Sequence, residues 1–162
     1  MSKNFLIAVG IGIACVAIAV VGILFMQRGA RVGVTGQVLK VRTAPLDENS
    51  TIVVLDFRVT NPSDYPFVAR NVTAIFEDAS GNRTEGITAS EIDARHIFEG
   101  IPVLGEKYSQ TLIERDKVTP RGTLDRMVAA RFDMPEAKLQ GRKRFVVKIE
   151  EIDGQVFEIS EK

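Results

Sequence analysis

An uninterrupted apolar run near the N-terminus constrains this chain more than any other feature. From Phe5 to Met26 no residue is charged, strongly polar or proline. About 22 helical residues, rising about 1.5 Å each, measure about 33 Å, which matches the hydrocarbon thickness of a bilayer. Because the run is longer than the roughly 7 to 15 apolar residues of a cleavable signal peptide, we expect an uncleaved transmembrane helix.

The side of the membrane on which the rest of the chain lies is indicated by conflicting cues. Basic residues after the run, such as Arg28 and Arg31, outnumber Lys3 before it, and the positive-inside rule then favours a cytoplasmic domain. A short N-terminal tail followed by one long domain favours translocation instead, because long domains cross with weak regard to charge. We expect a cytoplasmic N-terminus and a periplasmic or extracellular domain.

Small residues form a stripe along the predicted helix. They recur at spacings of four, three, four and three residues, which places them on one helical face: Ala8, Gly12, Cys15, Ala19 and Gly22. Small side chains let a second helix approach closely within a membrane, so the stripe predicts contact with another integral membrane protein. The alternative is chance, since Gly10, Ala14 and Ala17 place small residues on another face.

The composition of the remaining chain indicates one domain with its own core. Basic and acidic side chains number 21 each, so no net charge favours nucleic acid as a partner. The one cysteine lies in the apolar run, so packing rather than a disulfide must stabilise the domain. We divide the chain into a tail (1–4), a transmembrane helix (5–26), a juxtamembrane segment with a first strand and a loop (27–50) and a β-sandwich domain (51–162).

Alternating apolar residues predict strands along the domain. The clearest strand is 51–60, where Val53, Leu55, Phe57 and Val59 form a core face and the residues between them are expected to face solvent. Further strands are expected at 32–41, 68–78, 84–88, 108–113, 124–132, 144–152 and 156–159, with a loop at 43–50 and a hairpin turn at 153–154. Many short strands without βαβ alternation predict an all-β, immunoglobulin-like antiparallel β-sandwich, with a barrel as the alternative.

The segment 85–107 is expected to be a long loop that contains one helical turn. Ser90 and Asp93 have the spacing of a capping box, and Pro102 is expected to stop the helix. Long irregular segments in compact domains often have a function. The segment is therefore a candidate binding region.

Four stretches of sequence carry a resemblance to known families. They are V-V-L-D-F-R-V-T-N-P-S-D-Y-P-F from Val53, F-E-D-A-S-G-N from Phe76, V-T-P-R-G-T from Val118 and A-A-R-F-D-M-P from Ala129. Together they resemble the telokin-like, immunoglobulin-like domains of bacterial cell-envelope proteins. The strand that ends in Asn61-Pro62 is also similar to the water-stress and hypersensitive-response domain. The resemblance implies a fold and brings no catalytic residue to a position in this chain.

The arrangement of reactive side chains predicts neither catalysis nor a cofactor or metal site. His96 is the only histidine, and no zinc-type spacing of histidine and cysteine occurs. Ser90, Asp93 and His96 follow one another too closely on one helical turn to converge as a hydrolytic triad. The acidic residues in 150–153 are expected at a solvated strand end rather than around calcium. We expect a protein that is not an enzyme.

The densest basic segment lies at 138–148. Within it, Arg142, Lys143 and Arg144 are candidate contacts to anionic lipid headgroups or to an acidic partner. The alternative is a charged hairpin loop that keeps a sheet edge soluble.

Two functions from different classes remain. The first is a single-pass, non-enzymatic accessory or scaffold subunit, whose helix packs on a larger membrane complex and whose sandwich docks on that complex. The second is an envelope module that binds or senses a small ligand or an extended peptide through a sheet edge or through 85–107. The first predicts that Gly12→Leu releases the protein from its complex. The second predicts that changes around His96 and Phe98 abolish binding.

Overall fold

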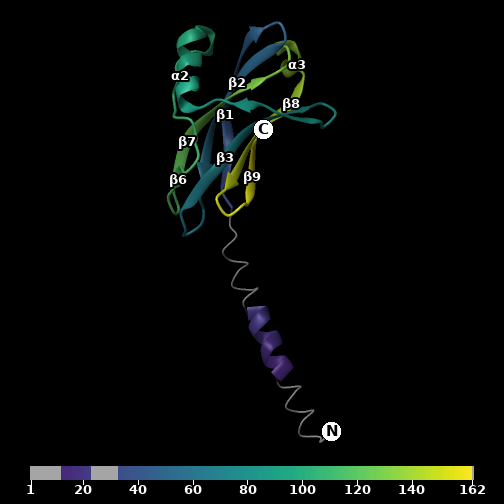
Figure 1. The fold of residues 1–162 in the computed structure, drawn as a ribbon, viewed down its shortest axis with the longest axis vertical. Coiled ribbons are helices and arrows are strands. Elements are labelled where there is room, and N and C mark those ends of the chain that lie inside the picture. The colour runs from purple at the N-terminus through teal and green to yellow at the C-terminus, as the bar shows by residue number, and fades with distance from the viewer. Residues whose placement is uncertain (1–11, 23–32, 162) are drawn as a thin grey trace, which may run out of the picture. The chain divides into compact units, whose positions relative to one another are not determined.

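The computed structural model describes residues 12–22 and 33–161 (Figure 1). The chain divides into two compact units, Met1–Val32 and Gly33–Lys162. Residues 12–22 are helical with exposed side chains, while 5–11 and 23–26 of the predicted transmembrane run lie outside the described residues. Among the residues that are described, no helix is both long and apolar enough to cross a membrane.

The described part of the second unit is predominantly β, as predicted. Antiparallel pairing arranges its strands in two sheets. The first sheet has the order β1 (Thr35–Asp47), β2 (Ser50–Thr60), β7 (Thr123–Phe132), β5 (Ile87–Thr88). The second has the order β4 (Arg83–Glu85), β3 (Phe67–Asp78), β8 (Arg142–Glu151), β9 (Val156–Ser160), and β6 (Lys117–Val118) also pairs with β3.

The main hydrophobic core lies between the two sheets. Because side chains alternate along a strand, every second residue of each central strand points inward. On β2 these are the four residues predicted from sequence, all fully buried: Val53, Leu55, Phe57 and Val59. Phe145 of β8 joins the layers, since its ring centroid lies 6.0 Å from those of Phe76 and Phe132. The described strands therefore form two packed sheets and not a closed barrel.

The second face of β2 is not the solvated face that we expected. Val54 is fully buried and Asp56 is 7% exposed, whereas Arg58 is exposed. The upper part of this face is covered by the helix α2 (Glu91–Gly100) and the 3-10 helix η1 (Pro102–Leu104), which form a second apolar cluster with β1, β2 and β7. The prediction fails because Asp56, Arg58 and Thr60 give this face a polar pattern, while the helical segment that covers Ile52 and Val54 comes from a later part of the chain.

The helix α2 begins where the sequence predicted it. Ser90 is its N-cap, and its Oγ accepts a hydrogen bond from the backbone N–H of Asp93 at 3.1 Å. The helix ends at Gly100, two residues before Pro102, as predicted, and Pro102 then begins η1. The segment 85–107 thus contains more regular structure than we expected, and Figure 1 shows α2 lying against the first sheet.

The first strand is longer than predicted. β1 continues through the expected loop at 43–50 as far as Asp47, and only Glu48 and Asn49 form the turn to β2. Pro45 is compatible with this strand because β1 lies at the edge of its sheet, where a missing N–H need not break a ladder. β1 is consequently part of the compact unit that starts at Gly33, whereas we had placed it in a juxtamembrane segment.

Two further strand predictions need correction. Residues 108–113 form no strand, and only Thr111 makes an isolated bridge, to Met127 of β7. The expected strand at 84–88 is divided between the sheets, because β4 pairs with β3 and β5 pairs with β7. The strands predicted at 68–78, 124–132, 144–152 and 156–159 are confirmed to within two residues, as is the turn at 153–154.

Gly86 allows the chain to change sheets between β4 and β5. A Cβ atom at this position would lie 2.7 Å from the ring of Phe132 and 3.0 Å from the Cβ of Ala130. Phe132 is 1% exposed in the main core, so it cannot move aside without disturbing other core residues.

We predict that Gly86→Ala lowers the free energy of unfolding by about 1 to 3 kcal/mol, because the added methyl group overpacks the core. Urea unfolding followed by circular dichroism measures the change. Gly100→Ala is the matched control, since no atom lies within 4 Å of its added Cβ. A Gly86→Ala protein as stable as Gly100→Ala would contradict the packing argument.

Candidate functional site

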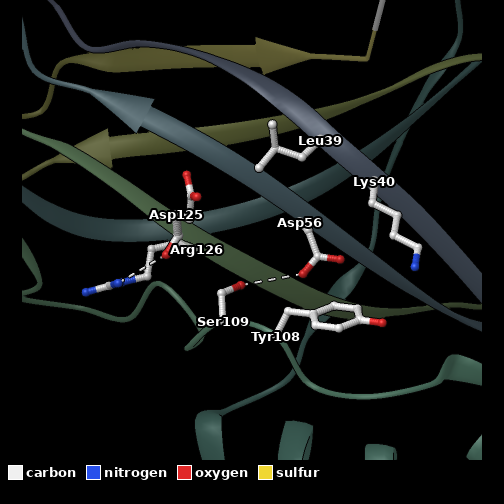
Figure 2. Close-up of a pocket in the computed structure, with 7 residues that line it drawn as sticks. All are labelled: Leu39, Lys40, Asp56, Tyr108, Ser109, Asp125 and Arg126. Atoms are coloured by element: carbon white, nitrogen blue, oxygen red, sulfur yellow. Dashed lines mark hydrogen bonds between the residues drawn. The ribbon is translucent and has the colours of Figure 1, made fainter.

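A hollow of about 230 Å³ opens on the outer face of the first sheet, where the helical layer ends. Its sides come from three segments that are distant in sequence: the middle of β1, the loop after η1 and the start of β7. Figure 2 shows Asp56 of β2 in the middle of this hollow. Around Asp56 lie Lys40, Tyr108, Ser109, Asp125 and Arg126. Leu39 completes the lining from β1.

Arg42 of β1 holds the loop after η1 against the sheet. Its Nη2 donates to Oδ2 of Asp56 at 2.7 Å, and its Nη1 donates to the carbonyl oxygens of Leu104 at 2.9 Å and Glu106 at 2.7 Å. The two side chains meet because Arg42 pairs with Val54 and Lys40 with Asp56, so Arg42 is the diagonal neighbour of Asp56 on one face. This contact fixes the upper rim of the hollow.

The position of Tyr108 is fixed by two cations. The guanidinium carbon of Arg42 lies 5.3 Å from the centroid of its ring, and Nζ of Lys40 lies 5.2 Å from it. Arg42 also lies 4.8 Å from the ring centroid of Phe98 in α2. Cations over aromatic faces are attracted by the ring quadrupole. Tyr108 is thus held in place although it is 65% exposed.

Some charged side chains around the hollow have a close ion-pair partner and others do not. Arg58 binds Asp125 through two hydrogen bonds of 2.7 and 2.8 Å, and this contact lowers the pKa of the Asp125 carboxyl. Arg126 has a loose ion pair with Asp116, 3.7 Å from its Nε, and its Nη1 donates a hydrogen bond to the backbone carbonyl of Asp125 at 3.1 Å. Its buried Nε makes no hydrogen bond with any described residue. Lys40 makes no ion pair within 33–161.

The chemistry of the hollow favours non-covalent binding. Oγ of Ser109 lies 3.5 Å from Oδ1 of Asp56, at the limit of a hydrogen bond, and no imidazole lines the hollow. His96 is instead exposed on α2. Among the described residues, no group of three or more histidine, cysteine or acidic side chains could hold a metal ion. The hollow therefore presents hydrogen-bonding groups, charge and one aromatic ring.

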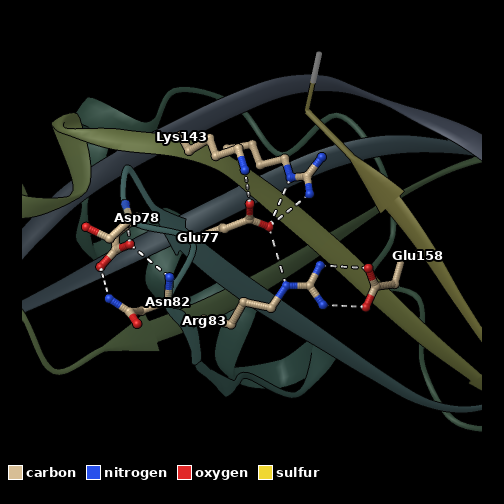
Figure 3. A network of polar contacts seen from close by, with 8 residues as sticks. Glu77, Asp78, Asn82, Arg83, Lys143 and Glu158 are labelled. Atoms are coloured by element: carbon tan, nitrogen blue, oxygen red, sulfur yellow. Dashed lines mark hydrogen bonds and ion pairs between the residues drawn. The ribbon is translucent and has the colours of Figure 1, made fainter.

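The predicted basic residues of β8 have partners within the domain. Arg142 donates twice to Glu161, at 2.9 and 2.8 Å, and Lys143 and Arg144 both contact Glu77, at 2.8 and 3.0 Å. Figure 3 shows Lys143 directed at the Glu77 carboxylate. The structure thus brings Lys143 and Arg144 together and places Arg142 in a separate pair. Much of the charge we assigned to lipid or partner contact is matched inside the domain.

Glu77 is the centre of an ionic network on the outer face of the second sheet (Figure 3). It is 4% exposed, and the hydrogen bond from Lys143 and those from Arg144 and Arg83 lower its pKa to about 2, against the opposing effect of desolvation. Arg83 of β4 also binds Glu158 of β9 through two bonds of 2.8 Å. Since β3 and β8 lie between those strands, this pair crosses both of them.

The predicted stripe of small residues falls partly in the described helix. Gly12, Cys15, Ala19 and Gly22 lie within the helical residues 12–22, and Ala8 lies outside the described residues. The side chain of Cys15 is exposed and its thiol is free.

The hollow itself was not predicted from the sequence. One signal could have indicated it: Asp56 interrupts the otherwise apolar centre of V-V-L-D-F. A carboxylate in the middle of a buried strand needs a partner, because burying an unpaired charge is costly. The partner, Arg42, and the loop residues Tyr108 and Ser109 carry no such local signal.

Comparisons with known proteins assign neither a family nor a function to the chain. No family model matches the chain, and no curated protein matches it. Among solved structures, it is similar to the X-ray structure of Northeast Structural Genomics Consortium target SoR45, at 15% sequence identity, over 82% of this chain and 81% of that chain, with a TM-score of 0.33. A similarity at this TM-score carries no argument about fold or function.

Replacing Arg42 by methionine is expected to destabilise the domain by about 3 kcal/mol or more, because it leaves the buried Asp56 carboxylate unpaired. Urea unfolding measures the loss. Arg58→Met is the control, since its pair with Asp125 lies on the same face but is about half exposed and is worth about 1 kcal/mol or less. Equal losses in the two variants would show that the Arg42 pair has no special role.

The lowered pKa of Glu77 predicts that the stability of the domain depends on pH. The Glu77 pKa is depressed in the folded state, to about 2 from the usual 4.5, so its contribution is present above pH 4.5 and is lost as pH falls toward 2. We expect the melting temperature to drop over this range in the wild type and to drop less in Glu77→Gln. Glu48→Gln, in the exposed β1–β2 turn, should keep the wild-type profile. The three curves would coincide if Glu77 were unimportant.

Proposed function

We propose that the protein is a single-pass, membrane-anchored and non-enzymatic accessory or scaffold subunit. Its N-terminal helix packs on a larger membrane complex, and its immunoglobulin-like β-sandwich docks on that complex outside the cytoplasm. The observation that carries the proposal is the apolar run Phe5–Met26, which is followed after six residues by a domain whose compact unit begins at Gly33. A run of this length and composition matches the span of a bilayer.

The topology of the domain supports the immunoglobulin-like assignment. Two antiparallel sheets pack around one core, and the chain passes from one sheet to the other several times, among them between β2 and β3, between β4 and β5 and between β7 and β8. Such crossings between sheets are typical of Greek-key sandwiches. Sandwiches of this kind often present loops and sheet faces for binding, but the fold alone does not define a function.

The side chains around the hollow support a binding role over catalysis. Asp56 is paired with Arg42 and Asp125 with Arg58, so both carboxylates already serve the structure. Ser109 has a carboxylate as its neighbour and no imidazole among the lining residues to act as a base. A nucleophile needs an adjacent base within hydrogen-bond reach, which this arrangement does not offer.

A second candidate function is an envelope module that binds or senses a ligand or peptide. The hollow around Asp56 favours it, because a concave site with a few polar groups and an exposed aromatic ring is typical of binding sites. The two candidates differ in the role of the helix. In the first the helix contacts a protein partner, and in the second it only anchors the domain.

The experiment that separates them is solubilisation of membranes in mild detergent, followed by native separation and mass spectrometry of the full-length chain. We expect stoichiometric co-migration with integral membrane proteins. Gly12→Leu should abolish it, because the larger side chain blocks close helix approach. Ala17→Leu places the same side chain on another face of the helix and should leave co-migration intact.

Migration of the wild-type chain as a monomer would remove the accessory-subunit proposal and favour the binding module. Recovery of the chain in the soluble fraction after alkaline extraction would remove the membrane anchor itself. Equal effects of Gly12→Leu and Ala17→Leu would assign the partner contact to a surface other than the stripe.

A further inference from the structure

We infer that the hollow around Asp56 is a docking site for an acidic, extended segment of a partner protein. The inference deepens the proposed function, since it names the surface of the domain that contacts a partner. It rests on the domain being an interaction module but not on the membrane anchor. The site lies on the outer face of the first sheet, at the border of the helical layer formed by α2 and η1.

Charge is the first argument. The pairs Arg42–Asp56 and Arg58–Asp125 each cancel, at 2.7 Å in both cases. What remains at the hollow is cationic: Lys40 makes no ion pair with a described residue, and the 3.7 Å contact with Asp116 is the only ion pair of Arg126 within the described residues. A surplus of positive charge complements carboxylates, which gives a partner both specificity and a faster encounter.

The positions of the two cations indicate an extended occupant. Lys40 and Arg126 lie on opposite sides of the hollow, with Asp56 and Ser109 between them (Figure 2). The volume of about 230 Å³ is below the roughly 300 to 1,000 Å³ of sites for compact small molecules. A peptide segment that crosses the hollow can direct one acidic side chain to Lys40 and another to Arg126.

Asp56 provides a partner for the backbone of such a segment. Its Oδ2 is occupied by Arg42 at 2.7 Å, but its Oδ1 has only the 3.5 Å contact with Ser109. A carboxylate oxygen in this state can accept a further hydrogen bond, and a peptide N–H is the donor that every residue except proline supplies. Because Arg42 compensates its charge, Asp56 does not repel the acidic segment as a free carboxylate would.

Two exposed apolar side chains at the rim complete the site. Tyr108 is 65% exposed and Leu39 is 45% exposed. Tyr108 contacts both Lys40 and Arg42 through its ring, so little side-chain freedom is lost when a partner covers it. Tyrosine and arginine are enriched among the residues that dominate binding energy in interfaces. We expect an apolar residue of the partner, adjacent to its acidic residues, to pack on Tyr108.

The test uses the full-length protein in detergent micelles and three fluorescein-labelled peptides of alternating sequence: glutamate with leucine, glutamine with leucine, and lysine with leucine. Fluorescence anisotropy measures binding at low and high salt. We expect the glutamate peptide to bind about tenfold more tightly than the glutamine peptide, with weaker binding at high salt. The lysine peptide should bind weakest.

Variants then locate the binding site. Lys40→Glu should weaken binding of the glutamate peptide by about tenfold or more, because it replaces attraction by repulsion. Lys138→Glu makes the same change of charge at an exposed position of α3 (Glu136–Gln140), away from the hollow, and should not alter affinity. Tyr108→Ser should weaken binding while the salt dependence stays the same. Circular dichroism shows that each variant is folded.

Equal affinity for the three peptides, no detectable binding of the glutamate peptide, or equal effects of Lys40→Glu and Lys138→Glu would each overturn the inference. The result is independent of the membrane experiment. Co-migration with membrane proteins without binding of the glutamate peptide would support the subunit proposal and contradict this docking site. Binding of the glutamate peptide through Lys40 by a chain that migrates alone would support the docking site and contradict the subunit proposal.

Discussion

The contacts of the Arg42 guanidinium hold α2, η1 and the loop that follows them against the first sheet. They join a β1 residue to Asp56 of β2 and to two backbone carbonyls of the chain that follows η1. A buried ion pair is stabilising only when additional hydrogen bonds satisfy its other polar atoms. Here the carbonyls of Leu104 and Glu106 accept from Nη1, while the buried Nε makes no hydrogen bond with a described residue. The same guanidinium lies against Phe98 and Tyr108, so the end of α2 and the rim of the hollow are positioned by one side chain.

The outer faces of the two sheets are covered by different kinds of side chain. On the first sheet, α2 and η1 cover Val54 and its neighbours with apolar side chains. On the second, Ile75 and Val146 are 3% and 1% exposed while the Arg83–Glu158 pair spans from β4 to β9 above the strands that carry them. Long charged side chains can cover apolar surface with their stems. The covering of the first sheet depends on apolar packing, and that of the second sheet depends on carboxylates that remain ionised.

The proposed docking site lies where the helical layer ends. Beyond Asp56 the outer face becomes polar, with Arg58 and Asp125 exposed and paired to each other. A border of this kind is concave because the loop that carries Tyr108 and Ser109 stands above an otherwise open sheet. The loop that follows η1 therefore contributes to the proposed function by supplying one wall of the hollow, and Arg42 keeps that wall in place.

The sequence by itself determined the class of the fold, most strand positions and the N-cap of α2, because alternation, turn residues and capping depend on neighbours in the chain. It predicted the inner face of β2 but not the burial of Val54, which follows from a helix that begins more than 30 residues later, nor that of Asp56, which is paired with Arg42. Only the tertiary structure decided the hollow, since Arg42 meets Asp56 across 14 residues and Leu104 across 62. It also matched Lys143 and Arg144 with Glu77, across 66 and 67 positions. Contacts between residues so far apart depend on how the sheets pair and pack, and no local pattern encodes that pairing.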